Sequence, residues 1–349
     1  MTFQDKTIYI NGIKLGKEQP CFIIAEIGIN HNGKIEVAKK LIDESVKCGA
    51  NAVKFQKRNL DALYREEVLR DPNIESQGLE ILLDVLKKVE LSESDYADIV
   101  QYCSKRGIIF LCTPWDIDSV DFLESLNVPA YKIASPDMTN FPLIRHVGKT
   151  NKPILISTGM STMGEIEKTV DFLKSENIEF ILMHSNSTYP APVESLNLSL
   201  IRVLEQKFQN LIGYSGHEQG ITPSVIAYAL GAVIIERHIT IDKTMEGIDQ
   251  SSSLEPHEFV QLVSFIREAE KAVGNPIKKM TRGEILQREV LGKSILAGSD
   301  IMSGDIFTES NIIVKGPAKG LSPQYFYEIL GKKSNRNIKK GTYLQQEDI

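Results

Sequence analysis

The sequence predicts an α/β protein, namely a TIM (β/α)8 barrel followed by a small β-rich domain. Short β-rich runs alternate with amphipathic helical segments from residue 21 to residue 273. This makes about eight β-α units in about 250 residues, the size typical of such a barrel. No G-x-G-x-x-G follows any of these runs, so a doubly wound dinucleotide-binding sheet, the alternative architecture, loses its main support.

The predicted strands are short, apolar and separated by helical patterns. Between them, apolar residues recur at helical spacing, as at Ile35, Ala38, Leu41, Ile42 and Val46. In a parallel barrel the carboxyl ends of all strands meet on one face, so side chains at those ends are expected to share one site. The predicted strands are residues 21–27, 52–56, 108–112, 130–133, 153–157, 180–184, 211–215 and 233–238.

Two segments depart from this alternation, and the second of them indicates the domain limit. Residues 57–91 are long, charged and irregular, and such a loop after a barrel strand is expected to serve as a lid or a partner contact. Gly274–Gly283 is rich in turn formers and basic residues, as linkers are. We therefore predict a barrel domain over residues 1–275, a linker over residues 276–287 and a small domain over residues 288–349.

The small domain contains a weak internal repeat. Gly292-Lys-Ser-Ile is echoed by Gly331-Lys-Lys-Ser, and Asp300-Ile-Met-Ser-Gly304 is echoed by Asn337-Ile-Lys-Lys-Gly341. Two similar halves of about 20 residues predict a pseudo-symmetric domain rich in turns. Because it has few apolar residues for independent stability, we expect it to dock against the barrel or against a second subunit.

Composition and charge argue against several classes of protein. The chain of 349 residues is 42% hydrophobic, and its net charge of -6 argues against a broad nucleic-acid or membrane surface. Cys21, Cys48, Cys103 and Cys112 are scattered with no C-x-x-C pair, which predicts neither a structural zinc site nor disulfides. The first residues lack an apolar signal core and no apolar run approaches membrane-spanning length, so we expect a cytoplasmic protein.

Two histidines stand at the carboxyl ends of neighbouring predicted strands. His217 follows Gly213-Tyr-Ser-Gly, and His238 ends Val233-Ile-Ile-Glu-Arg-His. Two neutral imidazoles with Glu26 nearby suit a borderline divalent metal such as Mn²⁺, Co²⁺ or Zn²⁺. The alternative is that each is a hydrogen-bonded core histidine, but their shared position at strand ends favours a functional site.

Three strands carry ionisable residues where a purely structural strand would be apolar. These are Glu26, Lys54 and Lys132, and burying an unpaired charge costs several kcal/mol, so each needs a partner. An internal Glu26–Lys54 ion pair is one solution, but it leaves Lys132 without an obvious partner. A bound anion would satisfy both lysines.

Hydroxyl residues at other strand ends strengthen the anion interpretation. Thr113, Ser135, Ser157 and Ser215 each follow or end a predicted strand. Singly, each is as well explained as a helix cap. Together they place neutral donors beside two ammonium groups, which suits a phosphate or a phosphorylated carboxylate. His31 and His184 are weaker candidates, and Trp115 is consistent with either a sugar pocket or packing.

These motifs together resemble the sialic acid synthase family, also called the N-acetylneuraminate or nonulosonate synthases. The resemblance covers nearly the whole chain, and the small domain is similar to the antifreeze-like (SAF) domain that ends such enzymes. The motifs that carry the resemblance are Ile24-Ala-Glu26-Ile-Gly-Ile-Asn-His-Asn-Gly33, Val53-Lys54-Phe-Gln56, Tyr131-Lys132-Ile-Ala-Ser135, Ser157-Thr-Gly-Met160, Ser187-Thr-Tyr189-Pro190, Gly213-Tyr-Ser-Gly-His217 and Glu236-Arg-His238.

The resemblance implies a metal-dependent, aldol-type synthase. Phosphoenolpyruvate would condense with the open-chain aldehyde of an N-acylated mannosamine-type sugar, N-acetylmannosamine first, releasing phosphate and forming a nine-carbon 2-keto acid. A legionaminate- or pseudaminate-type product, or a 6-phosphorylated acceptor, is the alternative within this chemistry. A lysine Schiff-base aldolase and a carbohydrate- or ice-binding protein with an inactive barrel are alternatives from other classes. The family's C-terminal domain also implies a domain-swapped homodimer.

The resemblance gives each candidate residue a role. His217 and His238 would hold a divalent metal, Mn²⁺ first with Mg²⁺ or Co²⁺ as alternatives, that polarises the aldehyde oxygen. Glu26 would orient or deprotonate the water that attacks C2 of phosphoenolpyruvate. The residues implied to hold the carboxylate and phosphate of phosphoenolpyruvate are Lys54, Thr113, Lys132, Ser135, Ser157 and Ser215. Those implied to contact the acceptor sugar are Ser187, Tyr189 and Asp249.

Two departures from the family pattern fall on the acceptor side. Asp137 stands near the point where bacterial N-acetylneuraminate synthases carry a glutamate. We take it as a candidate substrate-binding residue, although its shorter side chain reaches less far toward the sugar. The tail domain of those enzymes presents an arginine near the acyl group, whereas this chain offers only Lys315 and Lys319. We take Lys319 as the candidate substitute, although lysine lacks the bidentate fork of arginine.

Overall fold

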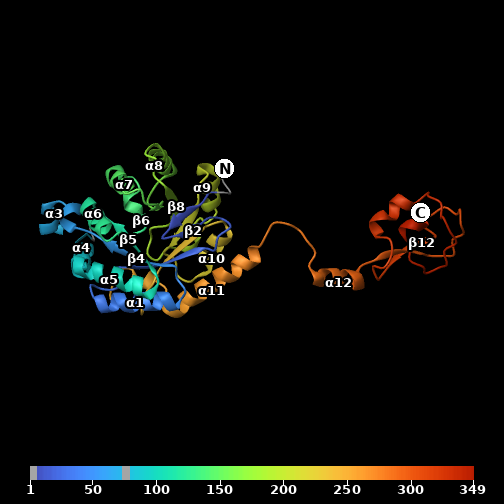
Figure 1. The fold of residues 1–349 in the computed structure, drawn as a ribbon, viewed down its shortest axis with the longest axis horizontal. Coiled ribbons are helices and arrows are strands. Elements are labelled where there is room, and N and C mark those ends of the chain that lie inside the picture. Colours follow the sequence, from blue (N-terminus) through green and yellow to red (C-terminus); the bar gives the residue numbers. More distant parts are fainter. Residues whose placement is uncertain (1–5, 73–78) are drawn as a thin grey trace. The chain divides into compact units, whose positions relative to one another are not determined.

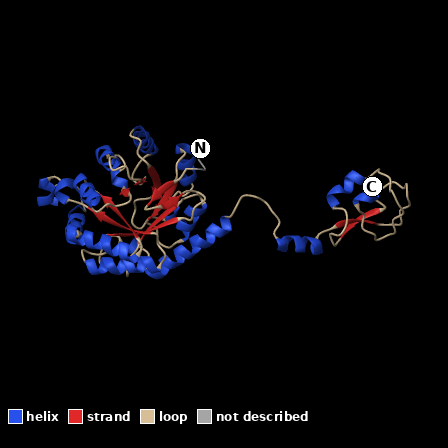
Figure 2. Ribbon diagram, viewed as in Figure 1, coloured by secondary structure: helices blue, strands red, loops and turns tan. Residues whose placement is uncertain are grey.

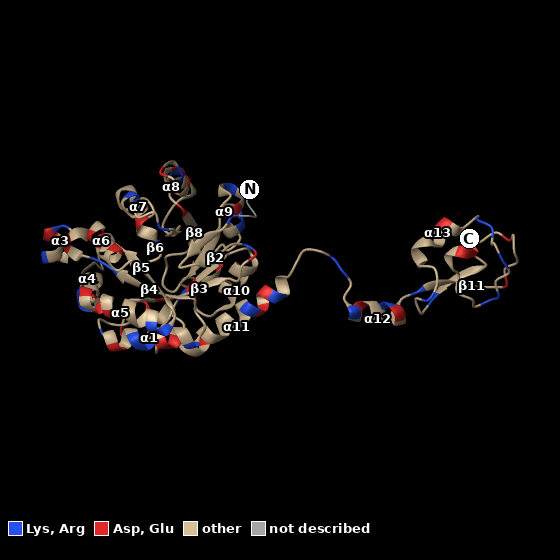
Figure 3. Ribbon diagram, in the orientation of Figure 1, with Lys and Arg blue, Asp and Glu red and all other residues tan. Residues whose placement is uncertain are grey.

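The structure is a computed structural model that describes residues 6–72 and 79–349. It divides into two compact units, Met1–Gly274 and Asn275–Ile349. No helix in the described ranges is long and apolar enough to cross a membrane. Lys and Arg are interspersed with Asp and Glu on the outer helices of the first unit, such as α1 (Ile35–Lys47) and α5 (Glu93–Arg106) (Figure 3).

The first unit is a closed barrel of eight parallel strands, which confirms the predicted fold class (Figure 1). The strands neighbour one another in the order β10-β3-β4-β5-β6-β7-β8-β9. Each predicted strand overlaps one of them and differs by no more than a few residues at its ends. The barrel strands are β3 (Phe22–Gly28), β4 (Ala52–Lys57), β5 (Ile109–Pro114), β6 (Tyr131–Ile133), β7 (Ile154–Ser157), β8 (Phe180–Ser185), β9 (Ile212–Gly216) and β10 (Ile234–His238).

Helices surround this barrel on its outer face (Figure 2). The segment 57–91, predicted as irregular, contains α2, α3 and α4 in its described part, because Asn59 caps α2 and α4 is strongly amphipathic. The helices of the first unit are α1 (Ile35–Lys47), α2 (Leu60–Leu63), α3 (Glu66–Arg70), α4 (Leu79–Val89), α5 (Glu93–Arg106), α6 (Ile117–Ser125), α7 (Phe141–Gly148), α8 (Met163–Ser175), α9 (Leu200–Phe208), α10 (Thr222–Ala229) and α11 (Pro256–Val273).

The barrel interior is filled by apolar side chains in its lower layers only. Successive side chains of a strand point alternately into the barrel and out toward the helices. Ile24 and Leu111 belong to the inner cluster, and so do three side chains of the N-terminal hairpin formed by β1 (Ile8–Ile10) and β2 (Ile13–Leu15). The hairpin therefore closes the amino-terminal end of the barrel. The polar inner side chains are left at the carboxyl end.

The second unit has its own core of nine buried apolar residues, which include Phe307 and Leu344. Its elements are α12 (Arg282–Leu291), β11 (Ser294–Ala297), β12 (Ile312–Lys315) and α13 (Phe326–Ile329). Ile301 and Ile338 exchange backbone hydrogen bonds of 2.8 and 2.7 Å, as related positions of a pseudo-symmetric pair do. The predicted linker overlaps the start of α12, since Thr281 accepts a bond from Glu284 N and caps that helix.

Candidate active site

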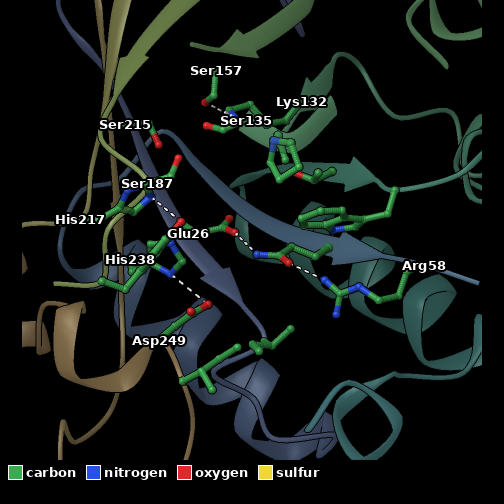
Figure 4. A pocket seen from close by; sticks show the side chains of 18 of the residues that line it. Glu26, Arg58, Lys132, Ser135, Ser157, Ser187, Ser215, His217, His238 and Asp249 are labelled. Atoms are coloured by element: carbon green, nitrogen blue, oxygen red, sulfur yellow. Dashed lines mark hydrogen bonds and ion pairs between the residues drawn. The ribbon is translucent and has the colours of Figure 1, made fainter. Parts of the chain in front are cut away.

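The carboxyl ends of the barrel strands surround one cavity of about 370 Å³, into which polar side chains from several strands converge (Figure 4). This is the face on which barrels of this type bind ligands. Of the fourteen predicted site residues, twelve line the cavity. They are Glu26, Lys54, Thr113, Lys132, Ser135, Ser157, Ser187, Tyr189, Ser215, His217, His238 and Asp249.

The cavity floor is built from charged residues that the barrel register sets side by side. Glu26 on β3 is aligned with Lys54 on β4 and with His238 on β10. Lys54 Nζ lies 2.8 Å from Glu26 Oε2 and 3.6 Å from Glu236 Oε1, and it donates to Thr113 Oγ1 at 3.0 Å. The internal ion pair that the sequence left open is therefore present, and Lys54 bridges two buried carboxylates.

The two carboxylates differ in their pKa directions. Burial raises the pKa of Glu26, although Lys54 and a bond from Gln56 act against it. Burial also acts to raise the pKa of Glu236, but Lys54, Lys132 and His238 together outweigh it and hold that pKa below its usual value. Glu236 is thus the fixed anion of the floor, whereas Glu26 is the carboxylate better suited to exchange a proton.

Lys132 has no carboxylate partner of its own. Its Nζ donates to Ser157 Oγ and, at 3.1 Å, to the backbone oxygen of Ile133, and it forms no ion pair with any described residue. Burial lowers its pKa to about 8, with Glu236 opposing the change. An ammonium buried without a counter-ion is a group that a bound anion stabilises.

Hydroxyl groups converge beside this lysine around a glycine. A Cβ added to Gly159 would overlap the hydroxyls of Ser135, Ser185 and Ser187, so a glycine is required by close approach. Gly159 N donates to Ser185 Oγ at 3.1 Å, and the buried Ser187 Oγ has no partner within the described part of the chain. These donors and Lys132 form a cradle that suits a phosphate or carboxylate.

His217 and His238 face each other across 5.5 Å between ring centroids. Asn186 O lies 2.6 Å from His217 Nδ1 and can only accept, so Nδ1 carries the proton and the Tyr189 hydroxyl donates to Nε2 at 2.9 Å. Burial lowers the pKa of His217 to about 3 and also lowers that of His238. Both imidazoles are therefore neutral, and His238 Nδ1 lies 3.6 Å from Asp249 Oδ2.

A buried ion pair outside the barrel holds the two histidines in place. Glu218 and Arg237 directly adjoin them in sequence, and their side chains, fully buried, lie 2.9 Å apart. Tyr214 and Ser224 also donate to Glu218. Because strand side chains alternate, Arg237 points outward while its neighbour His238 points inward. The pair ties the loop after β9 to β10.

The two remaining predicted residues lie elsewhere. Asp137 sits on a short 3-10 helix after β6, where its carboxylate accepts from Asn140 Nδ2 at 2.8 Å, and it is not part of the cavity lining. Lys319 lies in the second unit with an exposed side chain. His184, a weaker candidate, points outward and bonds Leu196 O at 2.8 Å, as a core histidine does.

Sequence reasoning missed Glu236, Gln56 and Arg58, which all line the cavity. The sequence contained the information needed to find them, because side chains two residues apart on a strand lie on the same face of the sheet. If Lys54 points into the barrel, so do Gln56 and Arg58, two and four residues further on. If His238 points inward, so does Glu236, two residues before it. Gln56 Nε2 donates to Glu26 Oε1 at 2.9 Å, and Arg58 Nη2 donates to Gln56 Oε1 (Figure 4).

The residues present fit a divalent metal, although the described residues hold no group of three or more His, Cys, Asp or Glu able to form a full cage. Two neutral imidazoles can ligate, and water or substrate oxygens complete many catalytic sites. The charged lining residues of the described chain already balance. They are the cations Lys54, Arg58 and Lys132 and the anions Glu26, Glu236 and Asp249. An anionic ligand therefore adds negative charge that a divalent cation offsets.

Fold and cavity together define a barrel protein whose mouth can bind an anion beside two neutral imidazoles. The chain belongs to the NeuB family, whose model matches residues 41–278. The SAF domain model matches residues 292–349.

Relatives match over nearly the whole chain. The N,N'-diacetyllegionaminic acid synthase of Campylobacter jejuni is 39% identical, covering 93% of this chain and 98% of its own. The human N-acetylneuraminate-9-phosphate synthase is 38% identical, covering 95% and 94%. The crystal structure of N-acetylneuraminic acid synthetase from Leptospira borgpetersenii, in complex with citrate, superposes with a TM-score of 0.74 at 33% identity, covering 81% and 95%. The names of these relatives show synthases of three different products, so they do not decide the exact substrate of this chain.

Proposed function

We propose that this chain condenses phosphoenolpyruvate with the open-chain form of an N-acylated mannosamine-type sugar, N-acetylmannosamine first, and releases phosphate. The product is a nine-carbon 2-keto acid, N-acetylneuraminate for that acceptor. The observation that carries the proposal is Lys132 in a NeuB-family chain. It is a buried ammonium without an ion-pair partner among the described residues, it bonds Ser157 in the cavity that also holds the hydroxyl cradle at Gly159, and the charges of Glu236 and Glu26 act on its pKa.

The cradle at Gly159 and the donors near it would position phosphoenolpyruvate. Lys54, Lys132 and the hydroxyls of Thr113, Ser135, Ser157 and Ser215 supply donors to its phosphate and carboxylate. Carbon C3 of phosphoenolpyruvate forms a bond to the aldehyde carbon, whose oxygen takes up a proton. A water oxygen adds to C2 and loses one proton. The bond from C2 to the phosphate oxygen then breaks as the new hydroxyl becomes the ketone, and the remaining proton of that hydroxyl passes to the departing phosphate.

Glu26 is the group that accepts the proton from the water. Its raised pKa makes the carboxylate a stronger base, and Lys54 and Gln56 fix its two oxygens so that the side chain does not rotate. Glu26→Gln should leave phosphoenolpyruvate binding nearly unchanged and slow turnover by about a hundredfold or more. Equal turnover in this variant would contradict the assignment.

A divalent metal belongs to this proposal, with Mn²⁺ first and Mg²⁺ or Co²⁺ as alternatives. His217 and His238 would hold the ion, which when bound polarises the aldehyde oxygen as a Lewis acid. Asn186 O keeps His217 Nε2 unprotonated, and burial keeps both rings neutral, so no proton must leave before a cation binds.

The acceptor would occupy the same cavity beside phosphoenolpyruvate. Ser187, Tyr189 and Asp249 line the cavity and offer hydroxyl and carboxylate partners to sugar hydroxyls. A diacetamido acceptor and a 6-phosphorylated acceptor are the alternatives, in line with the names of the relatives from Campylobacter jejuni and human.

The first test is phosphate release from phosphoenolpyruvate with Mn²⁺ present, measured on adding N-acetylmannosamine. Release that requires the sugar and stops with a chelator is the expected result. Gly159→Ala, which places a methyl group in the cradle, should raise the KM for phosphoenolpyruvate at least tenfold, while Gly164→Ala, with nothing within 4 Å of the added carbon, should not. No release with N-acetylmannosamine or with either alternative acceptor would contradict the proposal.

A Schiff-base aldolase is the second candidate, because the pKa of Lys132 is lowered to about 8. Borohydride reduction in the presence of pyruvate would trap such an adduct on the lysine. We expect no trapping, and a mass increase that disappears in Lys132→Met would favour the aldolase instead.

We also propose a domain-swapped homodimer, in which Lys319 of the second unit completes the acceptor site of a second copy. Exposed apolar side chains on α12, namely Ile285, Leu286, Val290 and Leu291, support an association surface. Sedimentation should give the mass of a dimer, and a fully active monomer would refute the swap.

A further inference from the structure

The outer rim of the cavity carries two buried N–H donors that the proposed mechanism does not use. Arg58 follows β4 and Trp115 follows β5, and the ladder continues past the strand ends, since Trp115 N donates to Lys57 O at 3.0 Å. Gln56 is aligned with Thr113 in the same ladder, so Arg58 and Trp115 form the next inward-facing pair. The pair lies two residues, about 7 Å along the strand direction, beyond Gln56 and Thr113 toward the carboxyl end.

Both donors lack a partner. Arg58 is 3% exposed; its Nη2 donates to Gln56, but its Nη1 is buried without a hydrogen bond to any described residue. The Trp115 indole Nε1 is likewise buried and unpartnered. The guanidinium lies 5.3 Å from the centre of the indole ring, so the two groups are held together (Figure 4 labels Arg58). Leaving a buried donor unsatisfied is costly, which indicates that a ligand completes the pair.

The residues around Arg58 and Trp115 indicate what kind of ligand group this pair binds. The cavity wall on this side is apolar, with Leu63 from α2 and Leu82 and Leu86 from α4. Lys57, the nearest further cation in sequence, is turned to Glu90 at 2.7 Å. A phosphate would require more donors than this rim offers. A carbonyl oxygen accepts two N–H bonds, and a small alkyl group attached to it packs against leucine side chains.

We propose that Arg58 and Trp115 form a subsite that binds the carbonyl of an acylamino group on the acceptor sugar, with the acyl alkyl group against α2 and α4. This inference rests on the proposed function, because it assumes that a sugar aldehyde reaches the floor beside Glu26. An acylamino group next to the aldehyde and one further along the sugar chain share this chemistry. Acceptors that carry one or both of these groups distinguish the two.

The test compares acceptors with and without each acylamino group. The acceptors are mannose, N-acetylmannosamine, 2,4-diacetamido-2,4,6-trideoxymannose and N-acetylmannosamine 6-phosphate. Arg58→Met removes the guanidinium donors, and Trp115→Phe keeps an aromatic ring but removes the N–H. Arg145→Met is the matched control, since Arg145 also lies over an aromatic ring, Phe172 at 5.1 Å, but is exposed to solvent. The readout is kcat/KM for each acceptor at saturating phosphoenolpyruvate.

A second readout does not depend on turnover. Trp115 is the sole tryptophan of the chain, so its fluorescence reports sugar binding at this rim when phosphoenolpyruvate is absent. N-Acylated sugars should change the emission of the wild type, and Arg58→Met should shift the titration midpoint about tenfold or more.

The expected result is a loss for acylated acceptors alone. Arg58→Met should lower kcat/KM about tenfold or more, and Trp115→Phe about fivefold, for sugars that carry the recognised acylamino group. If the variants lose kcat/KM with N-acetylmannosamine but not with mannose, the subsite binds the acylamino group next to the aldehyde. A loss that appears only with the diacetamido sugar assigns the distal one.

Other outcomes overturn the subsite. Equal losses for every acceptor would indicate a structural role, a loss confined to the 6-phosphate would indicate a phosphate site, and unchanged values in both variants would leave the donors without a ligand. These results differ from a failure of the proposed function, in which the wild type itself releases no phosphate with any of the four sugars. If Arg58→Met does not fold, Trp115→Phe alone decides.

Discussion

Lys54→Met should destabilise the barrel by about 3–5 kcal/mol at pH 7, the usual loss when one partner of a buried ion pair is removed. Methionine keeps most of the packing volume, so the loss isolates charge. Lys54 is the only cation within 4 Å of both Glu26 and Glu236 among the described residues. Its removal leaves two buried carboxylates facing each other. The loss is a large share of a typical stability of about 5–15 kcal/mol.

The assay is urea unfolding followed by the fluorescence of Trp115, which lies in the first unit and so reports barrel unfolding apart from the second unit. Glu26→Gln in the Lys54→Met background should recover part of the loss, because a neutral amide needs no counter-charge. Recovery stays partial, since Glu236 keeps its charge. The control is Lys152→Met, which breaks a more exposed pair with Glu124 and should change stability by less than about 1 kcal/mol.

The loss of unfolding free energy in Lys54→Met should also depend on pH. Burial already raises the pKa of Glu26, and removing Lys54 removes the cation that opposes this rise, so the folded state of the variant binds more protons than the unfolded state between the unfolded and folded pKa of Glu26. Stability of the variant then rises as pH falls from neutral toward the unfolded pKa, and the gap to wild type narrows. A gap below about 1 kcal/mol at pH 7, or a double variant no more stable than Lys54→Met, would refute the reasoning.

Three further predictions concern the histidines, the anion cradle and the outer ion pair. His217→Ala or His238→Ala should lower Mn²⁺ affinity and kcat together by about tenfold or more, measured by metal titration and phosphate release; unchanged values in both would remove the metal assignment. Because the Lys132 pKa is about 8 in the free protein and a bound anion raises it, the Kd for phosphoenolpyruvate should increase about tenfold per pH unit above 8. Calorimetry should show this slope in wild type and not in Lys132→Met, and the same slope in both would contradict it. Glu218→Gln, which leaves Arg237 buried without its counter-charge, should cost about 3–5 kcal/mol of unfolding free energy, and a change within 1 kcal/mol would show that the pair is not needed.

The barrel and most of its polar lining were predictable from one rule. Strand side chains alternate, so an ionisable residue inside an apolar run marks the inner face at the carboxyl end. Glu26, Lys54 and Lys132 were found in this way. The same rule, applied two residues along from Lys54 and from His238, reaches Gln56 and Glu236, which sequence reasoning did not include.

Other parts of the site arise from contacts that sequence spacing does not encode. The cradle at Gly159 depends on how closely the hydroxyls that follow β6 and β8 approach the backbone after β7. Asp137 was expected to reach the sugar, but the 3-10 turn after β6 pairs it with Asn140. Glu218 and Arg237 lie far apart along the chain and face the outer layer, where a buried ion pair is not indicated by alternation.

The balance of charges at the cavity floor links the buried ion pairs to ligand binding. The floor holds lysines and carboxylates in nearly equal number, next to inner apolar residues such as Leu111 and Leu155, which the strand register aligns with Lys54 and Lys132. Without ligand the charges neutralise one another, which lets a charged layer exist inside a barrel core. A multiply charged anion disturbs that balance unless Glu26, whose pKa is raised, takes up a proton or a cation binds at the neutral imidazoles. For the proposed anionic substrate and the proposed metal, binding of either should therefore strengthen binding of the other, because any favourable coupling between two ligands acts equally on both.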